Sequence, residues 1–589
     1  MFAPGPLLRL GKQGKLGKIG DLVTAIAGRG SPRIVAVHGS ATSPRAAMAA
    51  LLADEDLGRP FPKAVIAEAD DVARQADDVD PGRVDLTGQL VITIDPEGAK
   101  DHDDAIAVAR DGDAIRLWVH IADVSRFVRP EGAIDKEAAR RGNSVYVPGM
   151  VDPMLPKVLS NDVCSLRPGA DRKVVTVELL IGPDGEVRSA HFQRSTIHSR
   201  RRLTYPQVDR FFGGVSLGDA ELDADIAVAR EVAGWLRARR MGRGALEITT
   251  GEAAFRWDDD RLLGVEIEHQ TESHQLVEDC MIAANEAVAR FLLAKGVPTI
   301  YRFHDDPSET AIILLYDRLA ALGVAMAPLP DGPLTPEQCA QAARDAGAAI
   351  TAHVARHGGA RGLPVLVLRS LRQAYYSVEE SSHSGLASSA YLHFTSPIRR
   401  YPDLVAHRAL LDALGLDGQA DNALGCALAA EQSSLTERQA VNVERRADRI
   451  CLAYLVRDVI AEDHDQEFDG EVTGVGEAGL FVAFGPDLVY DGYLPARAIP
   501  GDWWTQDPLG VLLEGDESGR RIGIGDAIRV RVDDVQPLRG RVDLVPAGTV
   551  AKPSGAPGPR GRDAGKSGRP SRPPQDAGRG GNRHQRRRR

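Results

Sequence analysis

The sequence predicts a multidomain α+β protein that ends in a small all-β barrel. Three observations predict this class. The chain has 589 residues, too many for one hydrophobic core, so several domains are expected. From Val84 to about Leu414, strand-like and helix-like apolar runs are mixed without a regular βαβ repeat. From Phe468 onward the pattern changes to short strands separated by glycine and aspartate.

Residues 1–83 are expected to form an incomplete small domain followed by a linker. The segments "GDLVTAIAG" and "PRIVAVHG" have the composition of strands. Helical periodicity then follows in "SPRAAMAALLADEDL" and "FPKAVIAEADDVARQ".

Residues 84–460 are expected to form the main α+β domain. The apolar, β-branched runs "QLVITI", "AIAVA" and "IRLWVHIAD" predict strands. Helices are predicted at Val288–Leu293, Thr310–Leu322, Gln338–Arg356, Tyr401–Leu414 and Asn422–Ile460. The last is long and rich in Ala, Glu and Arg, and its period suits packing against the rest of this domain.

Residues 468–547 are expected to form a closed barrel of the OB type. Five short strands are predicted there: "FDGEVTGV", "GLFVAFG", "YDGYLPA", "GDAIRVRVDDV" and "GRVDLVPA". Residues 548–589 are rich in Gly, Pro, Ser and Arg and are expected to be disordered. The last 39 residues carry a net charge of +10, which leaves −21 for the first 550 residues of a chain whose net charge is −11. This asymmetry favours a polyanionic partner.

Composition excludes several other classes of protein. The five cysteines form no C-x-x-C pair, which argues against a zinc ribbon or a disulfide framework. No apolar run approaches the roughly 18 residues of a membrane span, and no signal peptide is recognised. We therefore expect a cytoplasmic protein without a membrane partner.

The segment "TIDPEGAKDHDDAIAV" places four aspartates between two predicted strands. Asp95, Asp101, Asp103 and Asp104 would repel one another unless a cation compensates their charge. Carboxylate oxygens are the ligands that Mg²⁺ prefers. A calcium loop of the EF-hand type fails, because Ala105 and Ile106 would occupy its fifth and sixth positions. A solvated acidic turn remains the plain alternative.

Two further segments strengthen the interpretation of a metal site for phosphate chemistry. Asp123 ends the predicted strand of "HIADVSRFV". In "HFTSPIRRYPDLVAHR", Arg399 and Arg400 follow a Ser-Pro turn and open a helix. Two guanidiniums at a helix N-terminus make a phosphate clamp, although a surface arginine pair is the commoner meaning of such a dipeptide.

These segments, with "YVPGMVDPMLPKVLSNDVCSLRPG" and "HQLVEDCMIAANEAVA", resemble in order the RNB catalytic domain of the ribonuclease II and ribonuclease R family. The resemblance covers about Val84 to Ile460. It implies that residues 468–547 are an S1-type OB domain that binds RNA. It also implies that residues 1–83 are the end of a cold-shock-like OB domain.

The resemblance assigns roles to individual residues. Asp95 and Asp104 would be direct Mg²⁺ ligands, Asp101 would support the site, and Asp103 would hold a second metal or the attacking water. Arg399 would neutralise the scissile phosphate and Arg400 the neighbouring backbone. The expected RNA contacts are Tyr146, Tyr205, Phe255, Glu278, Glu444 and Phe481. Without the family, Tyr146 and Phe255 would be expected to be core aromatics.

The activity implied is a processive 3′-to-5′ exoribonuclease. Such an enzyme would hydrolyse single-stranded RNA with a free 3′ end to nucleoside 5′-monophosphates, with Mg²⁺ or Mn²⁺ and as a monomer. The 2′-OH would distinguish RNA from DNA. Two other classes are considered: a catalytically inactive RNA-binding protein on the same folds, and a metal-dependent hydrolase of DNA or small nucleotides. The sequence departs from the family in its short N-terminal region, in Ser384 where relatives often have Phe, and in the variable position His102.

Overall fold

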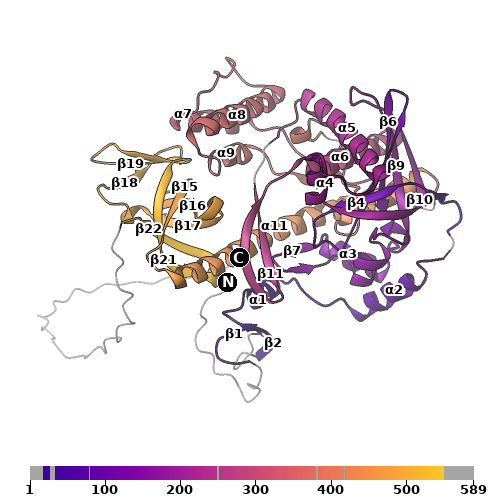
Figure 1. Cartoon of the computed structure of the whole chain (residues 1–589), viewed down its shortest axis with the longest axis horizontal. Helices are drawn as coiled ribbons and strands as arrows, with labels where there is room; N and C mark the ends of the chain where they lie inside the picture. The colour runs from indigo at the N-terminus through magenta and orange to yellow at the C-terminus, as the bar shows by residue number, and fades with distance from the viewer. Residues whose placement is uncertain are drawn as a thin grey trace, which may run out of the picture. The chain divides into compact units, whose positions relative to one another are not determined.

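The structure of the chain is a computed structural model. It describes residues 17–26, 33–78, 80–247, 251–379, 382–416 and 418–548 (Figure 1). The predicted disordered tail therefore lies outside the described residues.

A six-stranded mixed sheet forms the centre of the predicted main domain. Its order is β3-β10-β4-β5-β6-β9. The strands are β3 (Val84–Asp85), β4 (Val91–Asp95), β5 (Asp104–Asp111), β6 (Ala114–Ala122), β9 (Asp171–Ile181) and β10 (Val187–Thr204). Strand β10 pairs antiparallel with β9 along its first part and parallel with β3 and β4 along its last part. This long strand therefore joins both sides of the sheet.

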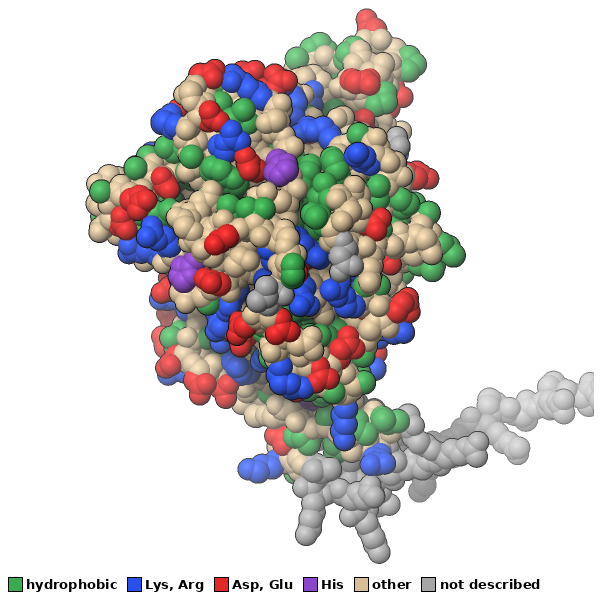
Figure 2. Space-filling model, turned by 90° about the vertical axis from the view of Figure 1, so that its right-hand side faces the viewer, with side chains coloured by type: hydrophobic (Ala, Val, Ile, Leu, Met, Phe, Trp, Pro, Cys, Tyr) green, Lys and Arg blue, Asp and Glu red, His purple; other side chains and the backbone are tan. Residues whose placement is uncertain are grey.

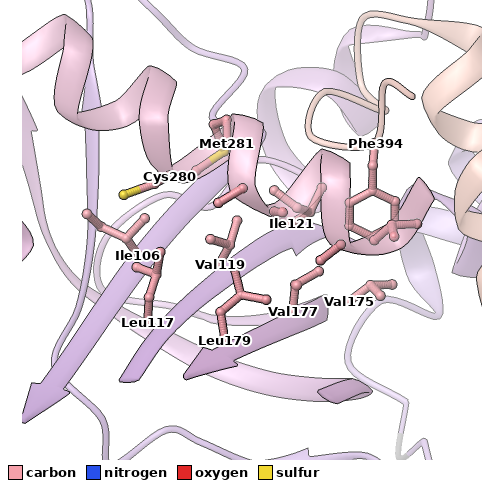
Figure 3. Close-up of a cluster of buried hydrophobic side chains, with 14 of the residues drawn as sticks. Ile106, Leu117, Val119, Ile121, Val175, Val177, Leu179, Cys280, Met281 and Phe394 are labelled. Atoms are coloured by element: carbon pink, nitrogen blue, oxygen red, sulfur yellow. The ribbon is translucent and has the colours of Figure 1, made fainter. Parts of the chain in front are cut away.

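Helices cover one face of this sheet. The helices α5 (Ala220–Gly242) and α6 (Glu272–Lys295) bury their apolar sides there. Figure 3 shows Cys280 and Met281 of α6 over Ile106, Val119 and other branched side chains of the strands. The helix predicted at Val288–Leu293 is thus the last part of a helix of 24 residues.

A second apolar layer packs against the opposite side chains of the strands. Ala105 and Ala107 of β5 meet Leu404 and Val405 in this cluster. The helices that supply residues to this layer are α2 (Lys63–Arg74), α3 (Ala133–Arg141), α10 (Tyr401–Ala413) and α11 (Ala423–Glu462). Helix α4 (Tyr205–Phe212) packs in the first cluster, and α7 (Glu309–Ala321), α8 (Pro336–His357) and α9 (Leu363–Ser370) form a separate cluster. The predicted long helix is confirmed as α11, with 40 residues.

The predicted barrel is confirmed. It closes in the order β15-β16-β17-β22-β21, and its strands are coloured orange to yellow in Figure 1. They are β15 (Glu467–Gly476), β16 (Gly479–Phe484), β17 (Tyr490–Pro495), β21 (Ala527–Gln536) and β22 (Arg541–Pro546). The sequence did not predict a small sheet inserted between β17 and β21. It contains β18 (Trp504–Gln506), β19 (Leu512–Gly515) and β20 (Arg521–Gly523).

The elements predicted near the N-terminus are also present. Strands β1 (Asp21–Ile26) and β2 (Arg33–Ser40) pair antiparallel, and α1 (Pro44–Asp54) follows. Two short hairpins pair β7 (Val145–Val147) with β8 (Met150–Asp152) and β11 (Glu252–Asp258) with β12 (Arg261–Glu268). Strands β13 (Tyr301–Phe303) and β14 (Tyr375–Ser377), which are far apart in the chain, also pair antiparallel. None of the helices in the described ranges is long and apolar enough to cross a membrane.

Candidate active site

The four aspartates lie on one connection between neighbouring antiparallel strands. Asp95 ends β4, Asp104 begins β5, and Asp101 and Asp103 lie in the loop between them. Asp95 and Asp103 are buried, whereas Asp101 and Asp104 are half-buried. The carbonyl of Asp103 accepts a hydrogen bond from the Ala122 N–H at 2.9 Å. We call this connection, residues 95–104, the acidic loop.

The backbone of the acidic loop is fixed by Ser165, from the motif "NDVCSLRPG". The Ser165 hydroxyl donates to the Lys100 carbonyl at 2.8 Å and accepts from the His102 N–H at 3.1 Å. The imidazole of His102 is buried, and its Nδ1 lies 2.8 Å from Asp95 Oδ2. Ser165 and His102 therefore hold the loop in place, a role that sequence reasoning did not assign to either residue.

The predicted arginine segment meets the acidic loop at Asp103. The Ile398 N–H donates to Asp103 Oδ1 at 2.8 Å, and Arg399 Nε lies 3.5 Å from Asp103 Oδ2. The fold thus brings together residues almost 300 positions apart in the chain. Since the Arg399 side chain is 45% exposed, its guanidinium can serve the buried carboxylate and also face a bound phosphate.

Burial and mutual repulsion raise the pKa values of two aspartates in the loop. Burial, only partly opposed by Arg399, raises the pKa of Asp103 well above its usual value. Burial and the negative charge of Asp95 raise the pKa of Asp104 to about 7. A bound cation would neutralise these carboxyl groups and stabilise their ionised form.

Arg400 is anchored more firmly than Arg399. It precedes α10, and its Nη2 donates to Asp403 Oδ1 at 2.8 Å. Asp403 is fully buried and also accepts from the Ser396 N–H at 2.8 Å. The opening of the predicted helix is confirmed, and Arg400 caps it by pairing with its first turn.

Tyr146 connects the acidic loop with the long helix α11. Its hydroxyl donates to Asp101 Oδ2 at 2.7 Å, and its backbone N–H donates to Glu444 Oε1 at 2.8 Å. The Tyr146 side chain remains 38% exposed. Tyr146 is therefore not a core aromatic: the structure places it at the surface beside the aspartates, together with Glu444.

Tyr205 lies beside the acidic loop, whereas Glu278 on α6 lies 3.6 Å from Arg240. Strand β10 pairs Thr204 with Asp95, so Tyr205 begins α4 directly beside the aspartates. The Tyr205 ring stacks on His274, with 3.7 Å between ring centres. Glu278 lies one helical turn beyond His274 and so on the same side of α6. No role was predicted for His274, although it begins the motif "HQLVEDCMIAANEAVA".

The two predicted phenylalanines lie in different places. Phe255 is half-buried on β11. That hairpin packs on the turn after Tyr146. Gly149 (φ +75°) lies in this turn, and a Cβ atom at position 149 would lie only 3.0 Å from the Trp257 ring. Phe481 lies on the barrel strand β16, is 53% exposed, and has its ring 5.4 Å from that of Tyr493. Phe481 therefore belongs to the barrel surface and not to the acidic loop.

The aspartate of "HIADVSRFV" does not join the acidic loop. Asp123 is fully buried between Arg83 and Arg194, and Arg194 Nε lies 3.2 Å from its Oδ2. Burial alone would raise the pKa of Asp123, but the two guanidiniums hold it well below its usual value. Asp123 is a structural ion-pair residue. The inference that it strengthens the interpretation of a metal site is therefore wrong.

The donor set of the acidic loop fits a divalent cation. All four side chains offer hard carboxylate oxygens, and the buried Asp103 Oδ2 has only the 3.5 Å contact with Arg399 Nε. Within the part of the chain that the structure describes, no three acidic, His or Cys side chains already converge as a metal cluster. Asp101 is turned toward Tyr146 instead. Side-chain rotation would therefore accompany metal binding.

Arg399 lies against the acidic loop, and an OB-type barrel follows later in the chain. Together these two features define a class of proteins that act on nucleic acids. Residues 83–415 match the RNB domain, and residues 463–545 match the S1 RNA binding domain. The chain belongs to the RNB family, as its motifs predicted.

Ribonuclease R proteins are similar to most of the chain. That of Escherichia coli is 36% identical over 475 residues, which are 79% of this chain and 57% of the relative. That of Thermotoga maritima is 34% identical over 527 residues, 87% of this chain and 72% of the relative. The matched part thus spans little more than half of the Escherichia coli protein.

A solved structure shows the same fold. Mycoplasma genitalium RNase R, in complex with ribose-methylated single-stranded RNA, superposes with a TM-score of 0.79 at 26% identity. The match covers 87% of this chain and 80% of that protein. The predicted combination of an α+β RNB domain and a C-terminal barrel is therefore confirmed.

Proposed function

We propose that this protein is a 3′-to-5′ exoribonuclease that hydrolyses single-stranded RNA processively to nucleoside 5′-monophosphates, in RNA degradation and processing. The observation that carries this proposal is the contact of Asp103 with Ile398 and Arg399. It brings the Arg399 guanidinium to one of the four carboxylates of the acidic loop, a position from which it could bind a phosphate. Membership of the RNB family supports the same activity.

Nucleases of this family depend on a divalent metal, and we propose Mg²⁺ here. Asp95, Asp101, Asp103 and Asp104 would hold it, and Mn²⁺ shares the same preference for oxygen ligands. When bound, the cation would lower the pKa of a water molecule and neutralise charge on the phosphate.

The side chains of the chain itself would bind and orient the RNA. Arg399, half-exposed beside Asp103, would contact the scissile phosphate. Tyr146 and Phe255 would stack on terminal bases, and Tyr205, supported by His274, would lie beside the sugar-phosphate backbone. Arg400, Glu278 and Glu444 would complete these RNA contacts.

The barrel provides a second surface for a single strand. A groove of about 580 Å³ combines exposed aromatic rings with arginines from the barrel and from α9 and α11. Its aromatic and basic residues are Phe481, Tyr493, Arg369, Arg449, Arg539 and Arg541. Figure 2 shows acidic and basic side chains interspersed over one face of the molecule. Such a basic groove would therefore concentrate the phosphate contacts that a net acidic body lacks.

The remaining parts of the proposal concern partners and compartment. We propose a monomer that acts on RNA with a free 3′ end in the cytoplasm. All five cysteines are free and buried, in keeping with a reducing compartment.

Two other functions are less well supported. A catalytically inactive RNA-binding protein has no need of an acidic loop in which Asp103 contacts Arg399, and all four aspartates of the loop are present. A hydrolase of small nucleotides has no need of the basic groove on the S1-type barrel, and a comparison of RNA with DNA of the same sequence tests a hydrolase of DNA.

A time course with a 5′-labelled oligoribonucleotide tests the proposal. We expect stepwise shortening from the 3′ end with Mg²⁺, none with EDTA, and no shortening of the same sequence as DNA. Binding without shortening would instead support the inactive protein. Equal degradation of RNA and DNA would support the second alternative.

Metal binding should be visible in thermal stability, with a defined pH dependence. The folded-state pKa of Asp104 is raised to about 7, so the metal-free protein keeps a stability contribution below about pH 4 and loses it as the pH rises through 7. A cation that binds ionised carboxylates would restore it. We therefore expect Mg²⁺ to raise Tm by several degrees at pH 8 and by much less at pH 5.

Asp104→Asn is the matched variant for this measurement. Because this substitution removes the titrating carboxyl group, the increase in Tm caused by Mg²⁺ should differ less between pH 5 and pH 8. Equal shifts at pH 5 and pH 8 in the unmodified protein would contradict metal binding at the acidic loop.

A further inference from the structure

Two histidines lie on neighbouring turns at the end of helix α8. They are His353 and His357, and the second of them is the last residue of the helix. Residues four positions apart lie on the same side of a helix, and the centres of these two imidazole rings are 4.6 Å apart. His357 is exposed and His353 is half-buried, so both rings can be reached from solvent.

Neither ring has a polar partner that accounts for its position. Among the residues that the structure describes, neither imidazole forms a hydrogen bond or an ion pair. Arg356, which lies between the two histidines in the sequence, donates instead to the Ala352 carbonyl at 3.0 Å. Neutral imidazoles offer a nitrogen lone pair each, so the end of α8 presents two such donors of electron pairs side by side.

The spacing of the rings fits two ligands of one transition-metal ion. An imidazole nitrogen binds Zn²⁺ at about 2.0–2.1 Å, so two imidazoles on one tetrahedral ion have ring centres roughly 5 Å apart. The observed distance of 4.6 Å is close to this value. The segment "HVARH" also repeats the histidine spacing of the H-E-x-x-H zinc motif, but without its catalytic glutamate. It therefore offers metal binding without hydrolytic chemistry.

We propose that His353 and His357 bind a divalent transition-metal ion such as Zn²⁺, at a site separate from the acidic loop. Imidazole nitrogens suit Zn²⁺, Ni²⁺ and Cu²⁺, whereas the carboxylates of the acidic loop suit Mg²⁺. The two sites therefore select different metals. Because two histidines leave coordination positions for water, the metal on α8 exchanges with solvent.

Metal binding at this site would stabilise the connection between α8 and the barrel. The segment after His357 leads directly to β15, where the Arg361 and Gly362 N–H groups donate to Glu471 Oε1 at 2.9 and 2.8 Å. A metal ion that bridges the last two turns of α8 opposes fraying of the helix end. The connection would then be held at one end by the metal and at the other by the buried Glu471.

Titration calorimetry of the untagged chain with ZnCl₂ at pH 7.5 tests this inference. Excess MgCl₂ would be present throughout, to compete for the carboxylates of the acidic loop. His353→Ala and His357→Ala should each weaken Zn²⁺ binding at least ~10-fold, because each leaves a single imidazole without its chelating neighbour. Zn²⁺ should also slow amide hydrogen exchange in residues 354–362 of the unmodified protein, but not in either variant.

His191→Ala is the matched control, because His191 is an exposed histidine on a strand, β10. It should bind Zn²⁺ like the unmodified protein, and so should Asp103→Asn, in which the acidic loop is altered. Unchanged Zn²⁺ affinity in His353→Ala and His357→Ala would overturn the inference. A lower Tm of these variants without metal, at unchanged Zn²⁺ affinity, would show instead that the histidines serve the negative end of the helix dipole.

Discussion

Asp103→Asn should lower RNA cleavage at least ~100-fold while leaving RNA binding nearly unchanged. Asp103 is 3% exposed, and its Oδ1 accepts the Ile398 N–H at 2.8 Å. An asparagine oxygen can keep that bond, so the contact between the acidic loop and the arginine segment survives. The negative charge opposite Arg399 and the oxygen offered to a cation are lost, and these are the features that catalysis requires.

Asp113→Asn is the matched control for this variant. Asp113 lies in the turn between β5 and β6, where its exposed carboxylate pairs with Arg188 at 2.9 Å. Single-turnover cleavage with excess protein, Kd in EDTA and Tm should be measured for both variants. A cleavage rate near that of the unmodified protein would remove Asp103 from the catalytic residues. A large fall in Tm would show that the charge serves the fold instead.

The sequence predicted the chemical character of the site because its motifs are local. The four aspartates fall within ten positions, between two runs whose β-branched composition defines strands. The barrel strands were predicted for the same reason, since each is a short alternating run ended by glycine or aspartate. The inserted sheet of β18, β19 and β20 was not predicted, because its strands are only three or four residues long.

Contacts between distant segments could not be predicted from sequence alone. The hydrogen bond from Tyr146 to Asp101 and the stacking of His274 on Tyr205 arise from how the strands and α6 are packed. Composition also cannot separate a metal-binding aspartate from a structural one, as Asp123 shows.

Asp123→Ala should reduce the free energy of unfolding by about 3–5 kcal/mol, although Asp123 contacts none of the proposed catalytic residues. Removal of its carboxylate leaves the buried Arg194 guanidinium without its counter-charge and leaves Arg83 paired with Asp80 alone, at 2.6 Å. It also removes the oxygen that accepts from the Ser125 hydroxyl at 2.6 Å. Because the two arginines hold the pKa of Asp123 well below its usual value, the stabilisation is present above about pH 4 and is lost as the pH falls below that.

Urea unfolding followed by circular dichroism at pH 7 and at pH 3 would measure this effect, with Asp113→Ala as the control. The ion pair of Asp113 with Arg188 is exposed at 68% and 42%, so its loss should change stability by less than about 1 kcal/mol. At low temperature, where Asp123→Ala remains folded, RNA cleavage should persist, in contrast to Asp103→Asn. A variant that unfolds like the unmodified protein but no longer cleaves RNA would place Asp123 in the catalytic site after all. Retained folding with intact cleavage would instead show that Arg83 and Arg194 find other partners, Arg83 through its bonds to the Val174 and Ser195 carbonyls.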